Sequence, residues 1–82
     1  MRMSPELLFL MRAEALTMSG VAMAVLDRAA ADAAIGATVR ALGGADNCAA
    51  AFAYECGEHP DITAERMRAA RLTVADLYGE MT

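Results

Sequence analysis

The sequence is poor in the residues from which most catalytic and metal sites are built. It has one histidine, two cysteines, two tyrosines, two phenylalanines and no tryptophan. It contains no phosphate-binding glycine loop, no nucleophile and base at a catalytic spacing, and no paired-carboxylate pattern. We therefore expect a protein that is not an enzyme and that requires no cofactor.

Positive charge is also scarce, and lysine is absent. Seven basic residues, all arginine, stand against eleven acidic ones, which gives a net charge of −4. Binding to nucleic acid through its phosphates requires a concentrated positive surface. Direct nucleic-acid binding is therefore not expected, whereas a basic protein partner is compatible with the acidic excess.

Long apolar runs are missing as well. The longest uncharged stretch, residues 15–26, has 12 residues, and a membrane-spanning helix needs about 18. Arg12 and Glu14 interrupt the apolar run near the N-terminus, and no small-residue cleavage site follows it. We expect a cytoplasmic protein with reduced cysteines and no membrane partner.

Alanine is abundant, and it is the residue that favours a helix most. The sequence predicts a single all-α domain over residues 1–82, a small bundle of about four helices at roughly 5–17, 20–42, 47–55 and 64–80. Ser4 followed by Pro5 is a typical helix start. Asp46 and Thr63 are expected to cap the third and fourth helices, with a loop over 56–61 between these helices. Whether 20–42 forms one helix or two stays open, with Gly20 and Gly36 as possible breaks.

Small residues mark one side of the middle segment, at Ala22, Ala29, Ala33 and Gly36. We expect the other helices to pack against this small-residue strip. In the first helix one face carries Leu7, Leu8, Met11, Ala15 and Met18. Phe9 and Leu10 lie outside that face, so this helix is apolar nearly all round. Such a helix is either enclosed by the fold or covered by another chain.

One group of residues has metal-binding atoms, namely Cys48, Cys56 and His59. If both cysteines lie on one helix, their Cα atoms are about 12 Å apart, beyond the ~7 Å limit for a disulfide. The spacing matches no paired-cysteine zinc pattern. A metal-binding regulator is thus the third functional hypothesis, and the plainer alternative is a buried Cys48 beside a surface loop.

Three arginines, Arg66, Arg68 and Arg71, form a local basic patch. The segment 63–77 around them resembles the opening of a phage-repressor type helix-turn-helix. It departs from that pattern because no turn divides it and no recognition helix follows. A solvated helix face is the plainer interpretation. If the patch binds anything, we expect carboxylates on a protein.

The leading hypothesis is a non-enzymatic protein-binding module, a small acidic stoichiometric inhibitor or adaptor of a larger complex. In size, acidity and lack of motifs the chain is similar to small phage-encoded inhibitors, including anti-CRISPR proteins. That similarity implies a basic nucleic-acid-binding protein as partner. The candidate contact residues are Phe9, Leu10, Leu72, Glu55, Glu58, Asp61, Asp76 and Glu80. The alternative is a homodimer formed through the apolar first helix and the small-residue strip.

Overall fold

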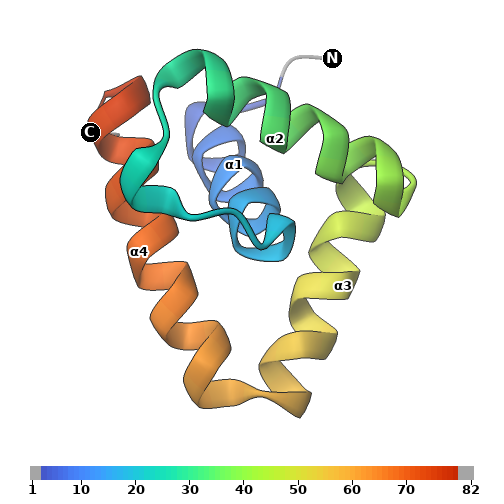
Figure 1. Cartoon of the computed structure of the whole chain (residues 1–82). Helices are drawn as coiled ribbons and strands as arrows, with labels where there is room; N and C mark the ends of the chain where they lie inside the picture. Colours follow the sequence, from blue (N-terminus) through green and yellow to red (C-terminus); the bar gives the residue numbers. More distant parts are fainter. Residues whose placement is uncertain (1–2, 80–82) are drawn as a thin grey trace.

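The computed structural model describes residues 3–79, and this part of the chain is a single all-α globule of four packed helices (Figure 1). The helices are α1 (Pro5–Ser19), α2 (Arg28–Leu42), α3 (Ala45–Glu58) and α4 (Pro60–Tyr78). A short 3-10 helix, η1 (Met23–Val25), lies in the connection between α1 and α2. The predicted fold class is therefore confirmed.

Helix α1 is the central element, and it packs against each of the other three helices. Figure 1 shows α2 crossing above α1, with α3 and α4 on either side of it and meeting at the far end. The core contains Ala13, Ala15, Leu16, Ile35, Cys48, Ala70 and Val74. Many of these side chains are small, so the core contains few large residues.

The small-residue strip is not where the other helices pack, and that prediction is wrong. Ala22, Ala29 and Ala33 are exposed. The buried side of α2 is instead the stripe of Ile35, Val39 and Leu42, which packs on the core as its spacing predicts. Alanine favours helix formation on either face, so its abundance does not identify the buried side.

The predicted helix over 20–42 ends where expected but begins only at Arg28, because the chain leaves the helix at Gly20, one of the two possible breaks. This residue has φ 74°, a left-handed conformation that glycine adopts without strain. Asp27 then caps α2, accepting a hydrogen bond at 2.7 Å from the Ala30 N–H. Between these residues Val21, Met23 and Leu26 pack on the core. Gly36 lies inside α2 and breaks nothing.

The predicted loop over 56–61 is reduced to one residue. Helix α3 continues to Glu58 and α4 begins at Pro60, with His59 between them. Proline is favoured at the first position of a helix because its missing N–H is not needed there. Thr63 is therefore no cap: it is buried within α4, and its hydroxyl donates to the Glu55 carbonyl at 3.2 Å.

Of the other two predicted helix caps, one is confirmed and one is wrong. Ser4 caps α1 as predicted, accepting a hydrogen bond at 3.1 Å from the Leu7 N–H. Asp46 does not cap α3, because it lies in the first helical turn after Gly44, whose lack of a side chain leaves that end without a side-chain cap. Within residues 3–79, no helix combines the length and the apolar character needed to cross a membrane.

Candidate functional site

The first half of α1 leaves large apolar side chains on the surface. Leu7 is 57% exposed and Leu10 is 42% exposed, and they extend a line that begins at Met3. They border a hollow of about 190 Å³ between the first turns of α1 and α3. We call this hollow the acidic groove; its lining is Met3, Leu7, Leu10, Met11, Glu14, Ala45, Asp46 and Ala49.

Two carboxylates lie among these apolar side chains, and within residues 3–79 none of the lining residues is basic. Glu14 comes from α1 and Asp46 from α3. Burial raises the pKa of Glu14 above its usual value. The pKa of the neighbouring Cys48 thiol is also raised, by burial and then by the charge of Glu14. The groove therefore presents one carboxylate partly withdrawn from water, Glu14, and one exposed carboxylate, Asp46.

A second apolar surface lies on α4 and has the opposite charge. Leu72 is 74% exposed, and with Arg68 and Arg71 it lines a hollow of about 300 Å³. We call these three residues the arginine face. On the other side of Leu72, Asp76 and the η1 segment border a further hollow of about 320 Å³. The arginine face thus has an acidic residue at one end.

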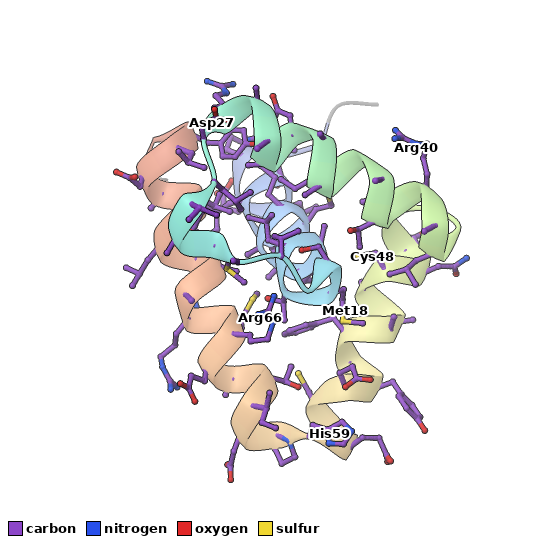
Figure 2. All side chains as sticks on the ribbon, in the orientation of Figure 1. Met18, Asp27, Arg40, Cys48, His59 and Arg66 are labelled. Atoms are coloured by element: carbon purple, nitrogen blue, oxygen red, sulfur yellow. The ribbon has the colours of Figure 1, made fainter. Side chains whose placement is uncertain are left out.

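Arg66 does not belong to this face, because its guanidinium turns toward the end of α1 (Figure 2). Its Nε donates to the Thr17 carbonyl at 3.2 Å, and its Nη2 donates to the carbonyls of Leu16 at 3.3 Å and Val21 at 3.4 Å. The last carbonyls of a helix lack partners within the helix. Arg66 satisfies two of them and holds the connection that follows α1.

A fourth hollow, of about 390 Å³, lies beside Arg66 where α3 meets α4. Glu55 and His59 line it together with Met18 and Ile62. Arg66 already donates to three carbonyls at this place, so its role there is structural. The hollow brings together one acid and one histidine, and the hydroxyls of Thr17 and Thr63, which also line it, donate to the carbonyls of Ala13 and Glu55.

The structure separates the predicted contact residues into several places. Leu10 lies on the acidic groove and Leu72 on the arginine face, both exposed. Glu58 and Asp61 are exposed on either side of His59, and Asp76 is beside Leu72. Glu80 lies outside the described residues. The residues therefore do not form one continuous site.

For two residues of α1, the observed exposure is the reverse of the expected one. Phe9, expected to lack internal partners, is half-buried and packs against the core. Leu7, expected on the buried face, is exposed. Val25 in η1 is 82% exposed and was not predicted either. Helical periodicity groups residues by face, but in a helix that is apolar all round it does not show which face meets the core.

The predicted metal ligands are not brought together. Cys48 is buried in the core, whereas Cys56 is exposed, and both are free thiols. Figure 2 shows His59 at the junction of α3 and α4, well apart from Cys48. Among residues 3–79, no three histidine, cysteine, aspartate or glutamate side chains are placed to hold a metal ion. The geometry gives no support to a metal-binding regulator.

Helix α4 runs without interruption through 63–77, so the turn of a helix-turn-helix is absent from this segment. Comparison of the chain with models of known families, with curated proteins and with solved structures finds no match.

Proposed function

We propose that this protein is a non-enzymatic protein-binding module that acts as a small stoichiometric inhibitor or adaptor of a larger protein complex. The acidic groove is the observation that carries this proposal. Met3, Leu7 and Leu10 present adjacent apolar surface to solvent, and a hollow lies between them and α3. Clustered exposed apolar side chains around a hollow are typical of protein interaction sites.

The charge of the groove favours a basic partner. Glu14 and Asp46 line the groove, and the whole chain has a net charge of −4. In such an interface the apolar side chains supply most of the affinity, while the carboxylates select the partner and accelerate encounter. A protein whose own basic surface binds nucleic acid fits this chemistry. Binding would then inhibit it by covering that surface.

Affinity capture tests this proposal. Tagged wild-type protein and two variants, Leu10→Glu and Ile62→Glu, are used to capture proteins from a nuclease-treated lysate of the source organism. Ile62 is a matched control because it is 64% exposed and lies outside the groove. We expect one companion in near-equimolar amount with the wild type and with Ile62→Glu. Leu10→Glu should lose it, because a buried carboxylate would oppose the contact.

Recovery of no companion, or equal recovery with Leu10→Glu, would contradict the proposal. Charge reversal at Glu58 and Asp61 measures how far the contact extends, since both side chains are exposed away from the groove. We expect this double variant to capture less of the companion if the partner presents a broad basic surface. Unchanged capture would confine the contact to the groove.

A further inference from the structure

The described chain carries two exposed apolar surfaces of opposite charge on different helices. The acidic groove lies between α1 and α3 and is lined by Glu14 and Asp46. The arginine face lies on α4 and consists of Arg68, Arg71 and Leu72. We propose that the protein self-associates head to tail, with the arginine face of one copy seated in the acidic groove of a second copy.

The side chains of the arginine face and of the acidic groove are complementary in charge, and both surfaces include exposed leucines. Leu72 is 74% exposed and is the apolar residue that would enter the groove, where it would meet Leu7 and Leu10. Arg68 precedes Leu72 by one helical turn, and both Arg68 and Arg71 line the same hollow as the leucine. The planar guanidinium binds a carboxylate through two parallel hydrogen bonds.

The acids of the groove have a reason to accept these arginines. Burial raises the pKa of Glu14, which means that its charged form is less well solvated than in water. A guanidinium from a second copy would stabilise that charge. Asp76, one turn beyond Leu72, is the exception to the complementarity. Repulsion between Asp76 and the groove acids favours one orientation of α4 in the groove of the second copy, in which Asp76 points out of the groove.

The contact is heterologous because the two surfaces are different parts of the chain. A pair keeps one free groove, on one copy, and one free arginine face, on the other, so further copies can add until a ring closes. This inference goes beyond the proposed function. A second copy and a protein partner would compete for the same groove, so self-association would limit partner binding at high protein concentration.

Sedimentation velocity on the full chain tests the inference, from about 10 µM to about 1 mM, a range that includes weak contacts. The samples are wild type, Leu7→Glu, Leu72→Glu, their equimolar mixture and the control Ile62→Glu. We expect the wild type and the control to rise above the monomer mass of 8.6 kDa with concentration. Each groove or face variant alone should associate at least about tenfold more weakly.

The mixture is the decisive sample. The intact arginine face of Leu7→Glu can enter the intact groove of Leu72→Glu, but no further contact can form. We therefore expect a species near twice 8.6 kDa and nothing larger. A wild type that stays monomeric, a monomeric mixture, or a Leu72→Glu variant that associates normally would each overturn the inference. The last result would indicate a symmetric contact between two α1 helices.

Charge variants keep the test valid if a leucine variant fails to fold. Glu14→Arg and Arg68→Glu should each associate more weakly than wild type, and their mixture should associate again because one copy restores the charges of the other. A mixture no better than either variant would overturn the inference. Partner capture at nanomolar concentration is independent of this experiment, so failure of one proposal does not imply failure of the other.

Discussion

The guanidinium carbon of Arg12 lies 3.9 Å from the centroid of the Tyr78 ring. Arg28 approaches the same ring at 4.8 Å, and the Tyr78 hydroxyl donates to the Asp32 carboxylate. Arg12 belongs to α1, Arg28 and Asp32 to α2, and Tyr78 to the end of α4. This cluster fastens the last turn of α4 to the two helices beside it.

Replacing Tyr78 should therefore destabilise the fold. We expect Tyr78→Ala to lower the free energy of unfolding by about 2–3 kcal/mol, because it removes both the packed ring and the cation–π contacts. Tyr78→Phe should cost only about 1 kcal/mol, since it keeps the ring and loses the hydrogen bond to Asp32. Urea denaturation measures both. Equal losses for the two variants would show that the hydroxyl, not the ring, holds α4.

The same residue predicts a loss of stability in alkali. Burial, and then the hydrogen bond and charge of Asp32, raise the pKa of Tyr78 from 10.0 to about 12 in the folded protein. A raised pKa favours the folded state below pH 10, and this contribution disappears as the pH rises toward 12. We expect the free energy of unfolding to fall between these pH values. Tyr78→Phe should show a smaller fall over the same interval.

Glu14 predicts a pH dependence in the acidic range. Its folded pKa is raised by burial from 4.5, so its contribution to stability is fully present below pH 4.5 and is lost as the pH rises through the folded pKa. Glu14→Gln removes the charge. We expect it to raise the melting temperature at pH 7 by at most about 4 °C, since partial exposure screens the effect. A lower melting temperature would indicate that the carboxylate is stabilised in the isolated chain.

Arg66 should be required for the order of residues 20–27. We expect Arg66→Ala to lower the free energy of unfolding by about 2 kcal/mol, because it removes the side-chain donor of the Thr17 and Val21 carbonyls and leaves Leu16 only that of Ser19. Arg66→Lys should recover less than half of this, since an ammonium group lacks the fork that reaches three acceptors. Hydrogen exchange should accelerate at 20–27 in both variants. Unchanged exchange would mean that core packing alone orders this segment.

Replacing two of the glycines with alanine should have opposite effects on the free energy of unfolding. Gly43 has φ 90°, and an added Cβ would lie 2.8 Å from the side-chain amide nitrogen, Nδ2, of Asn47. Gly43→Ala should therefore lower the free energy of unfolding by about 1–2 kcal/mol. Gly57 lies within α3, and a Cβ added there would meet nothing within 4 Å, so Gly57→Ala should raise the free energy of unfolding by about 0.5 kcal/mol. Thermal melts of the two variants check the contrast. A stabilising Gly43→Ala would contradict it.

Local chemistry made several features predictable from the sequence. The Ser4 cap depends on a side chain three residues from the N–H that it accepts from. The core stripe of Ile35, Val39 and Leu42 follows from helical spacing alone. The end of α2 at Gly43 follows from the ease with which glycine adopts positive φ. Each of these depends on interactions within a few residues.

Other features were decided only by how the helices pack. Leu7 and Phe9 are both apolar and close together on α1, yet Phe9 packs on the core and Leu7 remains exposed. Arg66 and Arg68 are two residues apart, yet only Arg66 finds backbone carbonyls to bind. The acidic groove and the arginine face arise in the same way, from where α1 and α4 lie relative to their neighbours.

The amino-acid sequence thus determined by itself that this protein is helical and where several of its helices begin and end, because hydrogen bonds and backbone conformation act over one turn. Only the tertiary structure decided that α1 is central and which of its apolar side chains stay at the surface. The reason is that burial depends on contacts between residues distant in sequence: Leu16 and Val74, for example, belong to the same core. Local pattern contains no information on that choice when a helix is apolar on every side.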